Sequence, residues 1–111
     1  MKYFLYKLIS PRPTFPQDIN EEEQKIMERH VDYWKQLAER RTAVFFGPVL
    51  DPKGVYGLAI VEAQEETLVE NIAYNDPAIS ASMGFKFEIY PFIDAVLRGW
   101  KIIFLDSDIY C

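Results

Sequence analysis

Residues 42–63 read TAVFFGPVLDPKGVYGLAIVEA, and this stretch decides which fold the chain can adopt. Two apolar runs flank Asp51 to Gly54, where aspartate, proline and glycine stand at the first, second and fourth places of a type I turn. The stretch therefore predicts a β-hairpin. Gly47 and Pro48 interrupt its first arm. Because proline donates no ladder hydrogen bond, that arm should be bulged there or lie at a sheet edge.

The segments on either side of this hairpin each predict a helix and a strand. Asn20 precedes three glutamates, which is typical of a helix start, because asparagine caps free N–H groups and acids favour the positive end of the helix dipole. We expect strands at 2–9, 42–50, 55–63 and 85–92, and helices at 20–41 and 64–74. This β-α-β-β-α-β order predicts an α+β, ferredoxin-like fold, with one four-stranded antiparallel sheet and both helices on one face.

Both faces of the expected sheet carry large apolar side chains. In the first strand, one face holds Phe4, Tyr6 and Leu8, and the other holds Tyr3, Leu5 and Ile9. One helical layer covers only one set, and the other would form an apolar patch larger than a monomer usually exposes. We therefore expect a homodimer or higher homo-oligomer in which two sheets face each other. Residues 93–111 should extend the same domain, with a strand at 100–105 that pairs with a sheet edge or reaches the partner subunit.

Length and charge exclude several classes of protein. The chain has 111 residues, half of them hydrophobic, which suits a single domain with one core. Its net charge is −5 and its basic residues are scattered, so neither nucleic acid nor an anionic membrane is an expected partner. Lys7 interrupts the hydrophobic start and no apolar run is long enough to span a bilayer. Neither a signal peptide nor a transmembrane helix is therefore expected.

Few residues are available to hold a cofactor. One histidine and one distant cysteine, Cys111, cannot build a nitrogen-rich or sulfur-rich metal site. No P-loop and no G-x-G-x-x-G motif is present, so no cradle for phosphate or dinucleotide is expected. A lone cysteine forms no internal disulfide, which favours a reducing, cytoplasmic location. We expect neither a metal nor a cofactor.

The only imidazole of the chain, His30, lies on a predicted apolar helix face. At about 100° per residue, it shares one arc with Ile26, Met27, Trp34, Leu37 and Ala38. A polar ring among core side chains needs a hydrogen-bond partner, because its burial otherwise costs stability. Since imidazole is the side chain that titrates near neutrality, His30 is a candidate general acid or base. The alternative is a structural histidine bonded to a backbone carbonyl or to water.

Six stretches occur in an order that points to a known family. They are Met1 to Phe4, the His-x-x-Tyr-x-x-x-Leu run from His30 to Leu37, Gly47-Pro48, Asp51 to Gly54 with Gly57, Asp76-Pro77, and Glu88 to Phe92. Together they resemble the YCII-related family of small dimeric α/β-barrel proteins over residues 1–92, which we take as the domain. The resemblance implies a ferredoxin-like protomer, a dimer whose sheets face each other, and a cleft beside the helix that carries the histidine.

The same resemblance implies a site but no defined reaction. In this family, which is largely of uncertain function, a histidine–aspartate pair has been viewed as a possible active site. Some relatives handle lactones or chlorinated aromatic breakdown products. Met27, Ala78 and Met83 depart from the family pattern, so no specific substrate is carried over to this chain.

Asp76 is the expected partner of His30, by that resemblance and because a break at a helix end often points into a pocket. A carboxylate there would hold the imidazole tautomer and stabilise its charged form. The alternative role of Asp76 is to cap the short turn that follows it. Asp51 is explained by its own turn.

Other hydroxyl groups have simpler explanations than catalysis. Three tyrosines could donate to a bound carbonyl or serve at an interface: Tyr33, Tyr74 and Tyr90. Ser80 and Ser82 lie near Asp76, but no nucleophile-elbow motif surrounds them, so a serine hydrolase is not expected.

Two functions therefore stay open for this chain. The first is a cofactor-free enzyme acting on a small, partly apolar organic molecule, in which His30 moves a proton and Asp76 orients it. Isomerisation, elimination and lactone chemistry need only these groups. The second is a non-catalytic dimer that binds a small ligand or serves assembly. The first requires that His30 line an open pocket with a carboxylate within hydrogen-bond reach.

Overall fold

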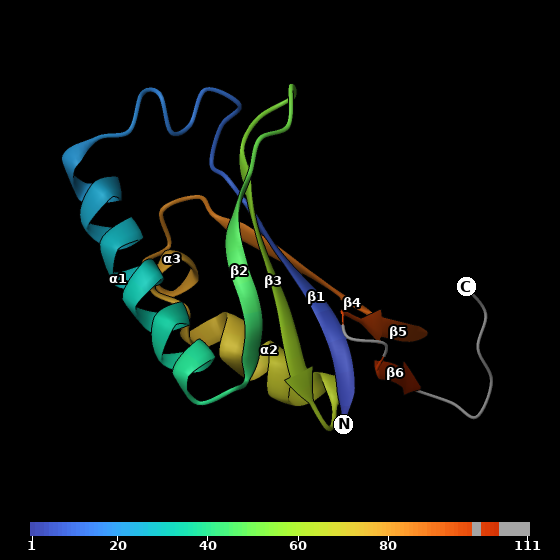
Figure 1. Cartoon of the computed structure of the whole chain (residues 1–111). Coiled ribbons are helices and arrows are strands. Elements are labelled where there is room, and N and C mark those ends of the chain that lie inside the picture. The colour runs from blue at the N-terminus through green and yellow to red at the C-terminus, as the bar shows by residue number, and fades with distance from the viewer. Residues whose placement is uncertain (99–100, 105–111) are drawn as a thin grey trace.

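The computed structural model describes residues 1–98 and 101–104, and it confirms the α+β, ferredoxin-like fold (Figure 1). In chain order the elements are β1 (Lys2–Ile9), α1 (Glu21–Glu39), β2 (Ala43–Val49), β3 (Tyr56–Ala63), α2 (Glu66–Asn75), α3 (Pro77–Ser80), β4 (Lys86–Pro91), β5 (Asp94–Leu97) and β6 (Lys101–Phe104). Among the described residues, no helix has the length and apolar character needed to cross a membrane.

The main sheet contains four antiparallel strands in the order β2-β3-β1-β4. Strand β2 lies at an edge, which confirms one of the two outcomes expected from Gly47 and Pro48. The register shifts between Ala43 and Phe45, however, and not at the proline, which stands opposite Gly57 without interruption. An edge strand tolerates proline because its outward N–H positions have no partner strand to serve.

The helices cover one face of this sheet (Figure 1), and that face supplies the core. In β1, Phe4, Tyr6 and Leu8 are all buried, as the alternation predicts. The opposite face is less covered, since Phe45 and Tyr90, on the two edge strands, remain 55% and 51% exposed. The protein thus presents one packed face and one face with large apolar and aromatic groups at its margins.

Helix α1 begins as its sequence predicts. The Asn20 side chain accepts a hydrogen bond from the N–H of Glu23 at 2.8 Å, and the Glu23 carboxylate accepts one from the N–H of Asn20 at 3.1 Å. This reciprocal pair is a capping box. The helix ends at Glu39 and not at Arg41, because Arg41 takes a left-handed conformation with φ of 66°. Every side chain of the predicted apolar arc is buried or half-buried.

Arg12 holds the segment between β1 and α1 against the start of α1. Its guanidinium donates to both carboxylate oxygens of Glu23 at 2.7 Å and to both of Asp18 at 2.9 Å, and we call this group the Arg12 clamp. Hydrogen bonds from Arg12 lower the pKa of both carboxyls. The same segment buries Phe15, whose ring meets that of Phe85 edge-on with centroids 5.3 Å apart.

The C-terminal part forms a separate two-stranded sheet. Strand β6 pairs antiparallel with β5, from Asp94 opposite Phe104 to Leu97 opposite Lys101. The expected extra strand therefore exists over part of its range, but it pairs with its own neighbour and not with an edge of the main sheet. In Figure 1 this hairpin lies on the side of the sheet away from α1. Trp100, Leu105 and Cys111 lie outside the described residues.

Candidate functional site

Asp76 lies at the junction of α2 and α3 and is fully buried, with 0% of its surface exposed. Helix α2 stops here because Pro77 disfavours a helical conformation in the residue before it. Asp76 is extended, with φ of −63° and ψ of 125°, and its Oδ1 accepts a hydrogen bond from the N–H of Ala78 at 2.9 Å. Asp76 therefore caps α3, which is the simpler of its two expected roles.

Three side chains from other elements converge on the same carboxylate. Its Oδ2 accepts a hydrogen bond from the Tyr6 hydroxyl at 3.0 Å and from the Trp34 indole N–H at 2.8 Å. The Nδ1 atom of His30 lies 2.9 Å from Oδ1 and 3.0 Å from Oδ2. The structure thus brings His30 and Asp76 together, as the sequence predicts. A cap needs only one acceptor oxygen, so capping alone does not explain this arrangement.

The surroundings of Asp76 favour the ionised form of its carboxyl. Burial alone would raise its pKa, but hydrogen bonds from His30, Trp34 and the Ala78 N–H, together with the charge of a protonated His30, lower the pKa below its usual range. The opposite effect reaches Tyr6, where burial and the nearby charge of Asp76 raise the pKa of the hydroxyl. Tyr6 therefore stays neutral and keeps donating to the carboxylate.

The charge of Asp76 determines where His30 carries its proton. An ionised carboxylate is an acceptor only, so the contact at 2.9 Å requires a hydrogen on Nδ1. In the neutral ring, Nε2 is then the unprotonated nitrogen and can accept a proton. In the charged ring, both nitrogens carry hydrogen, and Nε2 can return it. Nδ1 therefore holds the hydrogen bond to Asp76, and Nε2 is the nitrogen that can exchange a proton with a ligand.

Nε2 of His30 is available for chemistry. It makes no hydrogen bond to any residue that the structure describes. Within that part of the chain, every fully buried side-chain nitrogen or oxygen has a partner, so Nε2 must be accessible to solvent. The side chain as a whole is 15% exposed. His30 is therefore held on one side and open on the other.

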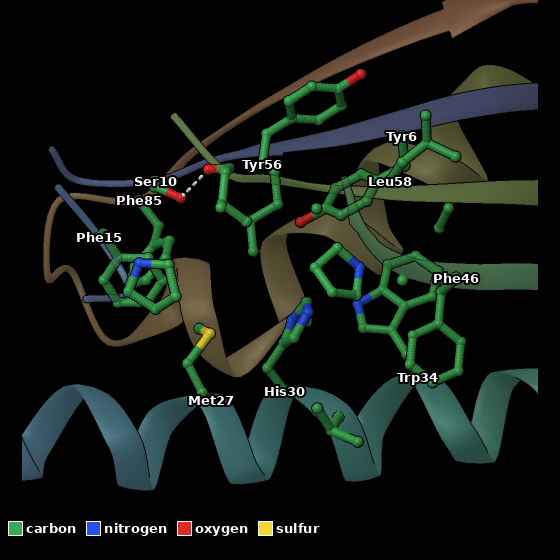
Figure 2. A pocket seen from close by; sticks show the side chains of 18 of the residues that line it. Tyr6, Ser10, Phe15, Met27, His30, Trp34, Phe46, Tyr56, Leu58 and Phe85 are labelled. Carbon is green, nitrogen blue, oxygen red and sulfur yellow. Dashed lines mark hydrogen bonds between the residues drawn. The ribbon is translucent and has the colours of Figure 1, made fainter. Parts of the chain in front are cut away.

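His30 lines a cavity of about 300 Å³ between α1, the segment before it, and the β2–β3 hairpin. Figure 2 shows the imidazole rising from α1 near the middle of this cavity, with Phe15 and Phe85 toward one end and Trp34 and Phe46 toward the other. Its walls are mostly apolar and aromatic, with few polar groups. A concave apolar site of this size with one convergent polar group is typical of small-molecule binding.

Small residues in β3 leave space for this cavity. Gly57 and Ala59 stand opposite Leu8 and Tyr6 of β1 and line the cavity. A Cβ atom on Gly57 would come within 3.2 Å of the Leu8 side chain, so this position has little room for a larger residue. The alternation of small residues on the helix-facing side of β3 therefore keeps a hollow open above His30.

The other polar candidates lie away from the cavity. Tyr33 donates its hydroxyl to the carbonyl of Ile72 at 2.7 Å, and Tyr90 donates to Glu88 at 2.9 Å. Asp51 serves its turn, where its carboxylate accepts the N–H of the residue two places on at 2.9 Å. Five candidates do not line the cavity: Tyr33, Tyr74, Tyr90, Ser80 and Ser82.

The sequence analysis missed Tyr6 and Trp34 as site residues. Both occupy positions where helix or strand periodicity predicts core, and both are indeed buried, at 1% exposure. The available signal was chemical, because a buried tyrosine or tryptophan needs a partner for its O–H or N–H. Gly47 and Pro48, which the sequence marked only as an interruption of the hairpin arm, also line the cavity.

Comparison with known proteins identifies a family. A family model described as the YCII-related domain matches residues 1–93. This chain belongs to the YCII-related family. The resemblance seen in the sequence is thereby confirmed. No curated protein matches this YCII-related chain.

The site of this YCII-related domain is not built like a metal centre. Within the described residues, no three histidine, cysteine, aspartate or glutamate side chains are gathered as metal ligands would be. The carboxylate at the centre of the site already accepts hydrogen bonds on both oxygens. The expectation that neither metal nor cofactor is used stays a prediction.

Proposed function

We propose that this YCII-related protein is a cofactor-free enzyme that transfers protons on a small, partly apolar organic molecule. His30 is the general base and acid, and Asp76 is its positioning residue. The single observation that carries the proposal is the geometry of His30. Its Nδ1 is fixed on a buried carboxylate at 2.9 Å, while its Nε2 makes no bond to the described protein and belongs to a ring that lines the cavity.

This geometry supports a simple proton cycle. In the neutral ring, Nε2 removes a proton from the bound molecule, and the ring becomes positively charged. The adjacent Asp76 carboxylate stabilises that charge, and Nε2 then returns the proton to another atom of the substrate or to a leaving group. Isomerisation and elimination require only such transfers, and hydrolysis of a lactone requires in addition a water molecule that attacks the carbonyl while Nε2 takes its proton. General acid–base catalysis of this kind contributes roughly 10²- to 10⁴-fold to a rate.

The alternative is a module that binds or assembles without catalysis. The observation that favours it is the number of structural duties that Asp76 performs, since it caps α3 and satisfies Tyr6 and Trp34 besides His30. On this alternative, His30 is one more donor that neutralises a buried charge. The two functions predict different results when the imidazole is removed, because only an enzyme would lose turnover of a bound molecule.

The experiment begins with a library of small organic molecules, screened for those that raise the melting temperature, because a ligand of the native state stabilises it. Molecules that bind are then tested for conversion by wild type and by His30→Gln. We expect His30→Gln to stay folded and to lose turnover by 10²-fold or more. Arg29→Gln, at the neighbouring exposed position on α1, is the matched control and should retain activity. Unchanged turnover in folded His30→Gln would contradict the role of His30, whereas molecules that bind to wild type without being converted would favour the binding module.

We further propose that the protein works as a homodimer in which the uncovered sheet faces meet. Phe45 and Tyr90 lie at the edges of this face, and the β5–β6 hairpin extends on the side away from α1 (Figure 1). An isolated two-stranded hairpin is marginal in water, so contact with a partner would stabilise it. Sedimentation equilibrium should give twice the monomer mass, and Phe45→Glu should shift it toward monomer. The cytoplasmic location remains a proposal of the same kind.

A further inference from the structure

We propose that the cavity beside His30 selects uncharged, mostly apolar molecules that carry a hydrogen-bond donor, and that it rejects anions. This inference rests on the proposed function, since it names the class of molecule that the same site takes. It follows from three features: the polar groups of the cavity wall, the charges around it, and the direction of the hydrogen bond at Nε2.

Most polar groups in the cavity wall are already engaged within the protein. The Tyr6 hydroxyl and the Trp34 N–H both donate to Asp76, and the Ser10 hydroxyl donates to the carbonyl of Val55 at 2.6 Å. Their donor hydrogens are thus unavailable to a bound molecule. An apolar ligand body would contact carbon atoms over most of its surface, and its polar group would find few partners away from His30.

Tyr56 does not change this conclusion. Its ring packs under the Lys7 ammonium, with Nζ 4.6 Å from the ring centroid. In the antiparallel register, Tyr56 stands opposite Ile9, which places it with Lys7 on the sheet face away from the helices. Figure 2 shows its hydroxyl directed away from His30. The imidazole therefore supplies the polar contact that a molecule in the middle of the cavity can reach.

The charges around the cavity disfavour an anion. None of the described residues that line it is lysine, arginine, aspartate or glutamate. The nearest buried charge is the negative carboxylate of Asp76, which lies directly behind His30 at 2.9 Å from Nδ1. Beside the neutral form of His30, a ligand carboxylate or phosphate would lose its hydration without gaining a cationic partner, and it would approach a like charge. An uncharged molecule meets neither obstacle.

The tautomer of His30 sets the polarity of the recognised group. Because Nδ1 holds the hydrogen that faces Asp76, the neutral ring presents a lone pair at Nε2. The matching group on the ligand is therefore a donor, such as a hydroxyl, an N–H or an acidic C–H. Aromatic side chains stand toward both ends of the cavity in Figure 2, so apolar parts of the ligand fit on either side of this contact.

Three probes of similar size test this selectivity. Benzyl alcohol is a neutral donor, anisole is its isomer with an acceptor only, and benzoate is an anion. Each is titrated into the protein while the ¹⁵N resonances of the imidazole are followed, which are unambiguous because the chain has one histidine. The pH is chosen so that these resonances report the neutral ring. We expect benzyl alcohol to bind and to shift Nε2, anisole to bind severalfold more weakly, and benzoate at least tenfold more weakly.

Two variants establish that binding occurs in the cavity. Val31 lines it and is 37% exposed, so Val31→Trp should obstruct the cavity without disturbing the core, and it should weaken benzyl alcohol binding at least tenfold. Val44 is 43% exposed and does not line the cavity, so Val44→Trp is the matched control and should leave binding unchanged. Equal effects of the two variants would overturn the inference.

The outcomes separate this inference from the proposed function. Benzoate binding as tightly as benzyl alcohol, or anisole binding as tightly, would overturn the ligand class even if His30→Gln abolishes turnover. The expected order of affinities together with full turnover in His30→Gln would retain the ligand class and remove the catalytic role. Benzyl alcohol that binds without moving the Nε2 resonance would also contradict the inference, because the donor contact would then be absent.

Discussion

Two buried acids, Asp76 and Glu23, organise two regions of this molecule in different ways. Asp76 is 0% exposed and Glu23 is 3% exposed. Both stand at the start of a helix, where one caps α3 and the other closes the capping box of α1. Both are hydrogen-bonded to a basic side chain, and in both the pKa of the carboxyl is lowered. By burial and charge alone, the two acids look alike.

The difference lies in the basic partner. Glu23 meets the Arg12 guanidinium, which is always charged and whose donors go to carboxylates and a backbone carbonyl. Asp76 meets an imidazole, which can gain or lose a proton at a second nitrogen facing a cavity. A buried acid–base pair therefore marks a candidate site only when the partner can titrate and reach a ligand. The Arg12 clamp fixes a segment of the chain, whereas Asp76 and its four hydrogen-bond donors, which we call the Asp76 cluster, hold a titratable ring beside a cavity.

The largest expected contrast is in stability. Asp76→Ala leaves the Tyr6 hydroxyl, the Trp34 N–H and the Ala78 N–H without their acceptor, so it should lower the free energy of unfolding by about 3–5 kcal/mol. Glu23→Ala should cost less, because Arg12 is 33% exposed and retains Asp18. Urea unfolding of both variants measures the two losses. A loss in Glu23→Ala as large as that in Asp76→Ala would show that the two clusters do not differ.

Acid should lower the free energy of unfolding partly through protonation of Asp76, and a variant can isolate this contribution. A carboxyl with a lowered pKa in the folded state stabilises the protein fully above its ordinary pKa of about 3.9. That contribution is lost as the pH falls through the lowered value. The free energy of unfolding should therefore decline less steeply below about pH 4 in Asp76→Asn than in wild type. Parallel declines in the two proteins would mean that the Asp76 carboxyl does not hold a lowered pKa.

The smallest effect should come from salt, which distinguishes the two clusters by exposure. Raising the ionic strength to about 1 M shortens the Debye length to roughly 3 Å and screens partly exposed charges more than buried ones. The stability difference between wild type and Glu23→Gln should shrink in 1 M NaCl, and that between wild type and Asp76→Asn should not. A salt dependence shared by both variants would contradict the expectation that the Arg12 clamp, in which Arg12 and Asp18 are partly exposed, is screened more than the buried hydrogen bonds of Asp76.

The sequence predicted most of the fold because each element carries a local signal. Asn20 and the glutamates that follow mark the start of α1, and Asp51 to Gly54 mark the hairpin turn, where the N–H of Gly54 does bond the carbonyl of Asp51 at 2.9 Å. The errors are local as well. The helix was expected to continue to about Arg41, but it ends earlier, because backbone conformation there depends on neighbours in space. Of the two outcomes expected for Gly47 and Pro48, the edge position is the one that occurs.

The candidate site was predicted only in part. His30 is marked by being the one polar ring on an apolar helix face, and Asp76 is marked by the family pattern at the end of a helix. Tyr6 and Trp34 were not, because their periodicity is that of ordinary core residues. No local pattern says that a strand tyrosine and a helix tryptophan will donate to the same carboxylate. That carboxylate lies 70 positions from the tyrosine and 42 from the tryptophan in the sequence.

The amino-acid sequence by itself determined the order of strands and helices, the helix face that carries the imidazole, and the family. These depend on periodicity, caps and turns, which act over a few residues. Tertiary structure alone decided that four donors meet on one buried carboxylate and that small residues of β3 leave a cavity above His30. Both arise where segments distant in sequence pack together, and the space between them depends on all of their side chains at once.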